Sequence, residues 1–295
     1  MLRHELPVPT APARSVVIGA AGFVGAELMR RLEAASAPAL GVTRREVDLL
    51  APGASDKLRS LLRPGDCVVA VSAMAPVKNT AMLADNMILT RVMVAAISAV
   101  PVSHVVNVSS DAIYGDEPLP LTEGAPAAPG SLHGAMHLAR EIAFRSEMTA
   151  PLAIVRPTLI YGAADPHNGY GPNRFRRQAN EGQDIVLFGE GEEQRDHVLV
   201  DDVAELIWRI VSRRSRGTLN IATGAVHCFK SIAERVVAAS PRKVAIKGSP
   251  RSGPIPHNGY RPFDAAATRA AFPDFAYCPI DRGIVQVQAQ VTGAE

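Results

Sequence analysis

The sequence predicts an α/β protein: a Rossmann-type, doubly wound parallel sheet with a smaller C-terminal region. Short apolar segments alternate with longer segments of helical spacing from Ser15 onward, as in strands that helices cover on both faces. A glycine-rich turn joins the first such strand to the first helix. Beyond Gly162, Gly, Pro, Asn and Arg become frequent, which predicts a smaller, loop-rich region laid over the sheet.

The expected elements follow one another in strand–helix alternation. The apolar segments that read as strands are 15–18, 39–42, 67–71, 104–108 and 152–155. The segments with helical spacing are 26–32, 86–100, 132–148 and 202–212. This alternation requires crossover connections, and crossovers produce a parallel sheet with helices on both faces. His104, at the start of an expected strand, is interpreted as a structural residue with satisfied hydrogen bonds.

The composition is that of a globular protein. Of the 295 residues, 47% are hydrophobic and 20% are charged, which excludes a disordered chain and a highly charged coiled coil. The net charge of +2, with both signs interspersed, gives no reason to expect nucleic acid or an anionic membrane as partner. Because the sequence has no uninterrupted apolar run of about 18 residues, no membrane-spanning helix is expected.

The cysteines and the first residues bear on the compartment. Cys67, Cys228 and Cys278 are far apart and form no C-x-x-C pair, so neither a disulfide framework nor a cysteine zinc site is expected. Residues 1–12 contain charged side chains and three prolines but no apolar segment of the kind that signal peptides have. We therefore expect a cytoplasmic protein.

A glycine turn follows the first expected strand. Gly19, Gly22 and Gly25 stand three residues apart in it. Residues without a Cβ atom allow backbone N–H groups to approach a pyrophosphate at the N-terminus of the next helix. Glycines also allow close helix–strand packing, but the place of this turn in the first strand–helix unit favours a dinucleotide site. We expect Gly19, Gly22, Phe23, Val24 and Gly25 to contact that cofactor.

The end of the second expected strand indicates which dinucleotide binds. Arg44 and Arg45 follow this strand directly, and Asp48 comes shortly after them. A guanidinium suits the 2′-phosphate of NADP, whereas a carboxylate suits the 2′-hydroxyl of NAD. Two arginines after a strand can also be merely solvated. We predict NADP as the cofactor, with NAD as the alternative, and Arg44, Arg45 and Asp48 as cofactor-binding residues.

Further motifs occur along the chain in a fixed order. They are Val108-Ser-Ser-Asp-Ala-Ile-Tyr-Gly115, Arg156-Pro-Thr-Leu-Ile-Tyr-Gly162, Arg195-Asp-His-Val-Leu-Val-Asp-Asp-Val203 and Leu219-Asn-Ile-Ala-Thr-Gly224. Together with the glycine turn they resemble the extended short-chain dehydrogenase/reductases, the sugar-nucleotide epimerase/dehydratase family. The resemblance covers the chain from about Ser15 to Arg282.

The resemblance implies an architecture and an activity. It implies a dinucleotide-binding domain from residues 1–165 and 196–224, and a substrate-binding region from residues 166–195 and 225–295. It implies a homodimer formed through the long helices expected at 86–100 and 132–148. The activity implied is NAD(P)-dependent reduction, epimerisation or dehydration of a nucleotide-linked sugar.

The resemblance also implies a catalytic site, and here this chain departs from the family. Members carry a serine or threonine, a tyrosine and a lysine beside the nicotinamide. Ser110 matches the serine, Asp111 matches the acid of dehydratases, and His133 and His137 stand where the tyrosine and lysine are expected. An imidazole, with an ordinary pKa near ~6.5, can transfer protons at neutral pH without help from an ammonium. We predict that Ser110, Asp111, His133 and His137 are catalytic, with His133 transferring the proton and His137 contacting the nicotinamide ribose.

Other contacts come from the resemblance alone. It implies that Ala73 and Pro157 bind the cofactor, and that Arg195 and Arg261 hold the diphosphate of the substrate. Leu159 stands where many members carry an asparagine that contacts the substrate.

Two alternatives stay open for the histidine pair. A His-x-x-x-His face on a helix is half of a zinc site, but the sequence offers no evident third ligand apart from Asp111, so no metal is expected. A site without the tyrosine and lysine also fits a non-catalytic dinucleotide-binding regulator or partner protein, because a fold does not guarantee an activity.

Overall fold

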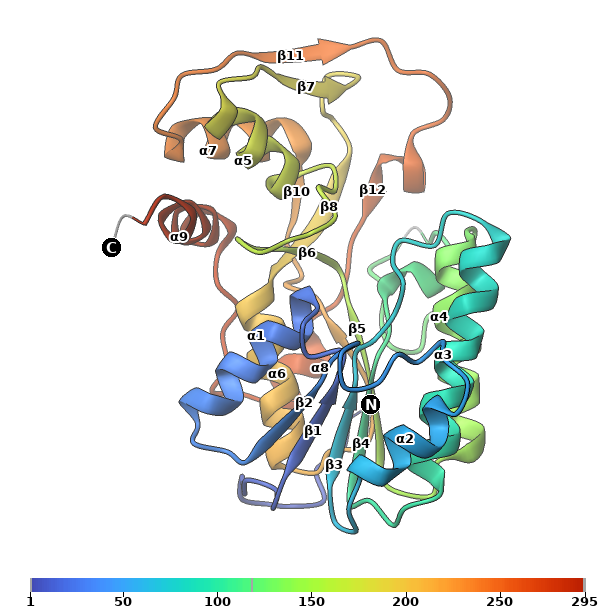
Figure 1. Ribbon diagram of the computed structural model, residues 1–295. Coiled ribbons are helices and arrows are strands. Elements are labelled where there is room, and N and C mark those ends of the chain that lie inside the picture. The colour runs from blue at the N-terminus through green and yellow to red at the C-terminus, as the bar shows by residue number, and fades with distance from the viewer. Residues whose placement is uncertain (1, 118, 294–295) are drawn as a thin grey trace.

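The computed structural model describes residues 2–117 and 119–293 and confirms the predicted fold class. Within these residues, the main sheet has six parallel strands in the order β2-β1-β3-β4-β5-β9 (Figure 1). These strands are β1 (Ser15–Ile18), β2 (Ala39–Val42), β3 (Cys67–Ala70), β4 (His104–Val108), β5 (Leu152–Pro157) and β9 (Gly217–Ile221). The chain leaves β1 toward β2 and returns to β3 on the other side, so the direction of winding reverses between β1 and β3. Ligands bind outside the carboxyl ends of the strands at such a point.

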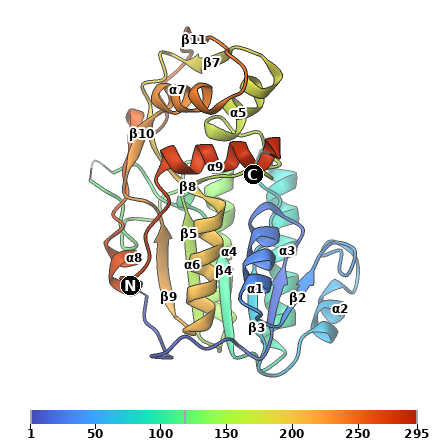
Figure 2. The same ribbon diagram turned by 90° about the vertical axis from the view of Figure 1, so that its left-hand side faces the viewer.

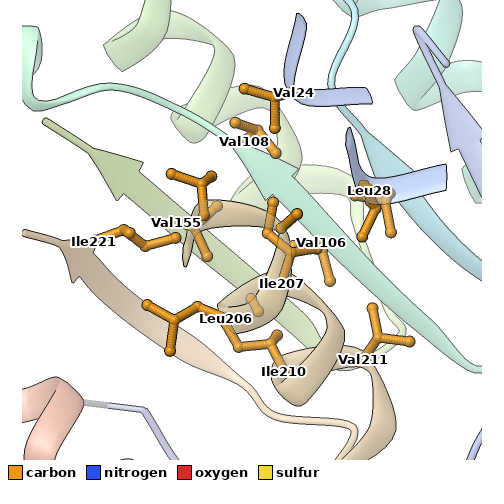
Figure 3. Packing of buried hydrophobic residues seen from close by; sticks show 14 of the residues in the cluster. Val24, Leu28, Val106, Val108, Val155, Leu206, Ile207, Ile210, Val211 and Ile221 are labelled. Atoms are coloured by element: carbon orange, nitrogen blue, oxygen red, sulfur yellow. The ribbon is translucent and has the colours of Figure 1, made fainter. Parts of the chain in front are cut away.

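Helices cover both faces of this sheet. The helices on one face are α1 (Phe23–Ala34) and α6 (Val200–Ser212), and those on the other are α2 (Ala54–Leu61), α3 (Thr80–Ser98) and α4 (Leu132–Glu147). Figure 3 shows Ile207 and Ile210 of α6 beside Val106 of β4, within the first of these two cores. Neighbouring strand residues belong to opposite cores, since Val105 packs with α3 and α4. Most positions of these strands are therefore apolar, which explains the apolar runs in the sequence.

A second lobe stands beyond the carboxyl ends of the main strands (Figure 1). Its strands are β6 (Leu159–Tyr161), β8 (Gln194–Leu199), β10 (Val226–Cys228) and β12 (Tyr260–Arg261), which form one sheet, and β7 (Ile185–Phe188) with β11 (Ile246–Ser249), which form another. Its helices are α5 (Pro172–Glu181), α7 (Phe229–Ala239) and α9 (Ile280–Thr292). Between the last two, α8 (Ala266–Ala271) returns to the main sheet and contacts β9 (Figure 2).

The expected smaller region after Gly162 is present, but it differs from the expectation in two respects. The region lies at the end of the sheet, because both sheet faces are already covered by helices. Its polar segment also contains a regular helix, α5, which begins at Pro172. Proline is tolerated in the first helical turn, where its missing N–H is not needed. Phe175 and Ala179 are buried in the core that α5 shares with α7, and this packing stabilises a helix that composition alone disfavours.

One described helix, α3, is long and apolar enough to cross a membrane when length and composition alone are considered. In the fold α3 packs between α2 and α4, and its residues Val92, Met93 and Ile97 are buried in the core beneath them. It is a core helix of the main domain.

His104 is confirmed as a structural residue at the start of β4. Its Nε2 lies 2.7 Å from the carbonyl oxygen of Ser215, and its Nδ1 lies 3.5 Å from Sγ of Cys67. Burial lowers the pKa of the His104 imidazole to about 4. The ring is thus neutral in the folded protein throughout the range in which an exposed histidine becomes charged.

This buried imidazole predicts a loss of stability in acid. Between its unfolded pKa near ~6.5 and its folded pKa of about 4, only the unfolded chain binds the proton, so stability falls as the pH falls through this window. The contribution reaches roughly 3 kcal/mol at its full extent. Urea unfolding of the wild type and of His104→Gln, at about pH 7.5 and about pH 4.5, measures it. The variant should lose clearly less stability between the two pH values, and an equal loss would contradict the prediction.

Candidate active site

The carboxyl ends of β1, β3 and β4 bring the expected glycine turn and the expected catalytic residues to one edge of the sheet. At this edge the winding reverses, and the backbone leaves each strand in a turn that exposes polar groups. The site therefore arises from segments that are far apart in sequence and that the parallel sheet places side by side.

The glycine turn has the geometry that a phosphate-binding turn requires. Gly19 has a φ of +97°, in the region that side chains disfavour. A Cβ atom on Gly25 would lie 2.1 Å from the carbonyl oxygen of Gly19, so no side chain fits at this approach of helix to turn. Gly22 is the N-cap of α1, and no side chain of the described residues caps this helix end. The helix N-terminus thus presents backbone N–H groups to an anion.

Phe23 and Val24 contribute differently from the glycines. Val24 is buried in the core beneath α6 and points toward Val108 (Figure 3). The Phe23 ring packs against the same core and lies close to Gly162. Both side chains hold the start of α1 against the sheet, so their backbone groups are what this turn offers to a cofactor.

A cavity of about 130 Å³ lies next to this turn, between the ends of β1, β2 and β3. Its lining includes Gly19, Arg44, Asp48 and Ala73, all of which sequence reasoning assigned to the cofactor. Arg44 forms an ion pair of 3.1 Å with Asp48 at the exposed rim. The cavity and the glycine cradle that a Cβ atom would fill are adjacent, as the adenosine end and the pyrophosphate of a dinucleotide require.

Arg45 and Pro157 stand apart from this cavity. Neither residue belongs to its lining. Arg45 is exposed beside Arg44, and Pro157 is the last residue of β5, paired in register with Ile221 of β9.

The turn after β4 holds two of the expected catalytic residues. The Ala112 backbone N–H donates to Oγ of Ser110 over 3.1 Å, and Ser110 Oγ donates to Oδ1 of Asp111 over 3.3 Å. A short 3₁₀ helix, η1 (Asp111–Ile113), follows, and the start of α4 packs directly on it. A Cβ atom on Gly134 would lie 2.0 Å from the Ala112 carbonyl oxygen. This approach, which only glycine permits, brings the neighbouring His133 to the site.

His133 and His137 lie against each other on α4. Their rings meet edge to face, with centroids 4.7 Å apart. Burial lowers the pKa of His133, Asp111 raises it in part, and His167 lowers it further. The Val77 backbone N–H approaches the Nδ1 atom of His133 at 3.5 Å. His133 is therefore a neutral imidazole at neutral pH.

His137 lies deeper than His133. Burial lowers its pKa well below the ordinary value, and the charges of His133 and Arg140 lower it further. Its Nδ1 atom is buried and has no hydrogen-bond partner among the residues that the structure describes. Two neutral rings, one above the other, thus occupy this face of α4.

Arg195 and Arg261 reach the same place from the second lobe. Strands β8 and β12 pair in parallel, with Arg261 opposite Arg195 in the register. Oδ2 of Asp111 lies 3.4 Å from Nε of Arg261 and 4.0 Å from a terminal nitrogen of Arg195. Arg261 also pairs with Asp116 at 2.7 Å, and Arg195 with Glu193 at 3.2 Å. The structure thus joins these arginines to Asp111, which sequence reasoning had assigned to a separate catalytic role.

Sequence reasoning missed a buried ion pair that positions these groups. Glu141 of α4 accepts two hydrogen bonds from the Arg156 guanidinium, of 2.8 Å and 2.7 Å, and one of 2.6 Å from Ser109. Arg156 also donates to the Tyr114 hydroxyl over 2.6 Å. The network ties α4 to β5 and to the turn after β4. Glu141 lies four residues after His137, so a charge on this inward helix face was the signal available in the sequence.

The sequence of this chain matches a known family over most of its length. Residues 15–222 match the NAD dependent epimerase/dehydratase family. The chain belongs to this family. The UDP-glucose 4-epimerase of Mycolicibacterium smegmatis is 26% identical over an alignment 247 residues long, which covers 72% of this chain and 77% of that protein.

Solved structures share the fold of this epimerase/dehydratase family member. The UDP-N-acetylglucosamine 4-epimerase from Bacillus cereus superposes with a TM-score of 0.82 at 22% identity, over 96% of this chain and 97% of that one. A GDP-L-fucose synthetase from Naegleria fowleri bound to NADP gives 0.82 at 15% identity, over 98% and 96%. The UDP-glucose 4-epimerase of Thermus thermophilus in complex with NAD gives 0.79 at 22% identity, over 96% and 100%.

Residues 2–117 and 119–293 contain no cluster of three or more His, Cys, Asp or Glu side chains arranged to hold a metal ion. His133 and His137 therefore stand in this family member as a pair, with Asp111 engaged by two guanidinium groups.

The buried ion pair predicts a large effect of one conservative change. Glu141 is 0% and Arg156 5% exposed at the side chain, so Glu141→Gln leaves a guanidinium without its counter-charge in the core. Unfolding should become easier by about 3 kcal/mol or more. Asp56→Asn, which breaks the exposed pair of Asp56 with Arg59, serves as control and should have almost no effect. Equal midpoints of urea unfolding for the two variants would contradict this prediction.

Proposed function

We propose that this protein is an NAD(P)-dependent enzyme that reduces, epimerises or dehydrates a nucleotide-linked sugar, with His133 as its proton-transfer group. The observation that carries the proposal is the position of a neutral His133 imidazole close to Asp111, at the edge of the sheet where the glycine turn lies. The match to the NAD dependent epimerase/dehydratase family and the 26% identity to a UDP-glucose 4-epimerase support it.

The residues act on the proton while the nicotinamide, when bound, accepts or returns a hydride. His133, kept neutral by burial, takes the proton from the reacting hydroxyl and gives it back in the reverse step. The Ser110 hydroxyl, fixed by the Ala112 N–H, hydrogen-bonds the reacting oxygen. Asp111 serves as the acid if the reaction is a dehydration, and His137 contacts the nicotinamide ribose. In this proposal His133 moves the proton, and Ser110 holds the reacting oxygen.

The second lobe supplies the substrate side of the site in this proposal. In sequence terms, residues 166–195 and 225–295 form the proposed substrate-binding region, and residues 1–165 and 196–224 form the proposed dinucleotide-binding domain. By these bounds β6 and most of β8 count with the dinucleotide-binding domain, although they pair in the sheet of the second lobe. Arg195 and Arg261, adjacent in the β8–β12 register, hold the diphosphate of the substrate. Known structures described as complexes with UDP-glucose, from Thermotoga maritima among others, support a nucleotide sugar as ligand class.

The cofactor proposed is NADP, with NAD as the alternative. Arg44 lines the dinucleotide pocket at its rim, and Arg45 is exposed next to it. Guanidinium groups at this position are suited to a 2′-phosphate. Solved relatives in the fold comparison include complexes with NAD and with NADP, so the choice rests on these two arginines.

A homodimer through α3 and α4 is part of the proposal. These helices pack on each other, and each exposes a large apolar side chain: Ile88 is 37% exposed and Ile142 is 54% exposed. Apolar side chains on neighbouring helices favour a protein interface.

A non-catalytic dinucleotide-binding regulator is the second candidate. The observation that favours it is the histidine at position 137, since a neutral imidazole has one N–H donor where an ammonium has three. A nicotinamide ribose would then be held less firmly, and binding would persist without turnover.

The two arginines predict a preference among dinucleotides. The wild type should bind NADP more tightly than NAD, and Arg44→Ala with Arg45→Ala should weaken NADP binding about tenfold or more while NAD binding changes little. Isothermal titration calorimetry measures both constants. Arg59→Ala, on the exposed side of α2, is the control for lost positive charge. Equal affinities of the wild type for the two dinucleotides would exclude the preference.

The role of His133 predicts a specific kinetic change. His133→Ala should lower turnover by about 10²- to 10⁴-fold and leave dinucleotide affinity nearly unchanged. In the wild type, oxidation of the hydroxyl should slow as the pH falls through the lowered pKa of His133, because the protonated ring cannot accept a proton. His4→Ala, whose ring contacts Ser215 and the Ala271 carbonyl outside the site, is the control and should keep turnover close to that of the wild type.

These measurements also separate the two candidate functions. Full turnover of His133→Ala would remove this residue from the mechanism. Dinucleotide binding without turnover of any nucleotide sugar by the wild type would favour the regulator.

A further inference from the structure

Arg140 is a charged side chain in the interior of the main domain. It lies on α4 three residues after His137 and is 1% exposed. Its guanidinium donates to the carbonyl oxygen of Ala70 over 2.7 Å, to that of Ser72, and to Oδ1 of Asn107 over 2.6 Å. Each guanidinium nitrogen thus donates one hydrogen bond, but all three acceptors are uncharged and leave the positive charge unbalanced.

No carboxylate of residues 2–117 or 119–293 forms an ion pair with Arg140. Burial lowers its pKa to about 10, which still leaves it charged at neutral pH. Buried charges are usually neutralised by an ion pair, and the next residue of α4, Glu141, forms such a pair with the buried Arg156. An uncompensated charge in a protein interior costs several kcal/mol, so the absence of a counter-ion here requires an explanation.

Asn107 is the side chain that accepts a hydrogen bond from Arg140, and it is neutral. Its Oδ1 accepts from Arg140, but its Nδ2 is buried and has no partner among the described residues. An aspartate of the same shape would lose no hydrogen bond and would supply the missing negative charge. The position nevertheless holds the neutral amide, which keeps the field of the guanidinium unscreened.

The guanidinium lies directly beneath the wall of the dinucleotide pocket. Ala70 ends β3, and Ser72 and Ala73 line the cavity. Ser72 also touches the glycine turn, since a Cβ atom on Gly19 would lie 2.8 Å from the Ser72 backbone nitrogen. The charge is therefore bonded to the backbone of the segment that packs against the phosphate-binding turn.

We propose that Arg140 is the fixed positive charge of the dinucleotide site, and that the pyrophosphate of the bound dinucleotide is its counter-ion. The proposal rests on the dinucleotide site of the proposed function. Arg140 acts through the low-dielectric interior and not by contact, which makes it a positioning residue for the anion. It supplies a positive charge to a site whose position 137 carries a neutral imidazole.

Asn107→Asp tests this proposal, because it neutralises Arg140 without removing it. The new carboxylate should raise the thermal stability of the ligand-free protein. It should also weaken binding of ADP-ribose, which carries the pyrophosphate, by about tenfold or more. Binding of adenosine, which carries no charge, should stay unchanged. The ratio of the two dissociation constants, measured by calorimetry, cancels any general effect on the pocket.

Asn220→Asp is the matched control. Asn220 is also buried with an unpartnered Nδ2, but it lies on β9, away from the pocket. Its change should leave the ratio of ADP-ribose to adenosine affinity unaltered. Arg140→Lys, which keeps the charge, should keep the ratio as well, whereas Arg140→Gln, which keeps donors but loses the charge, should lower it. If Asn107→Asp does not fold, these two Arg140 variants test whether the charge of Arg140 favours pyrophosphate binding.

The outcomes separate this proposal from the proposed function. A wild type that binds neither NADP, NAD nor ADP-ribose would overturn the dinucleotide site itself. Dinucleotide binding by the wild type, with an unchanged affinity ratio in Asn107→Asp and in Arg140→Gln, would overturn only the role of Arg140. Arg140 would then be a purely structural residue.

Discussion

The candidate site depends on one close contact, between the start of α4 and the turn after β4. Gly134 lies so near the Ala112 carbonyl that no side chain fits between them. This approach brings His133 close enough to Asp111 for the carboxylate to influence its pKa, although the turn and the helix are separated by a connection of more than ten residues. A larger residue would push α4 away from η1, and the imidazole would move away from the carboxylate with it. The chemistry of the site therefore rests on a packing constraint.

A buried ion pair between α4 and β5 helps to hold this contact in place. Glu141 and Arg156 neutralise each other in the core, and Ser109 completes the hydrogen bonds of the carboxylate. Such a pair adds little net stability over apolar side chains, but its geometry is specific, and breaking it leaves a buried charge. It therefore fixes the rotation and depth of α4, and with them the direction of the histidine pair.

Guanidinium groups are distributed unevenly around the site. Arg195 and Arg261 share Asp111 and have further carboxylate partners, whereas Arg140 on the opposite side has only neutral acceptors. On one side, the positive charge is largely compensated, so a substrate diphosphate would compete with carboxylates for it. On the other side, the charge of Arg140 has no carboxylate partner among the described residues, and its guanidinium donates to the Ser72 carbonyl next to the glycine turn. The two ends of the site are thus electrostatically different, and in the proposed function this difference orients a ligand that carries phosphates.

The amino-acid sequence by itself determined the main sheet, its order of elements and the glycine turn, because these follow from local patterns. Strands covered on both faces are predominantly apolar, and the turn between Gly19 and Gly25 needs residues without Cβ atoms. The family motifs added the candidates Ser110, Asp111 and His133. The composition of residues 163–177 disfavours a helix, and the packing of Phe175 against α7 stabilises α5 there. Only the tertiary structure decided which charges meet. Two ion pairs, Arg261 with Asp111 and Glu141 with Arg156, join residues from different strands and helices. The lack of a carboxylate near Arg140 likewise depends on which strands lie next to α4. Electrostatic interactions depend on distance and burial in space, and neither quantity is present in the order of residues along the chain.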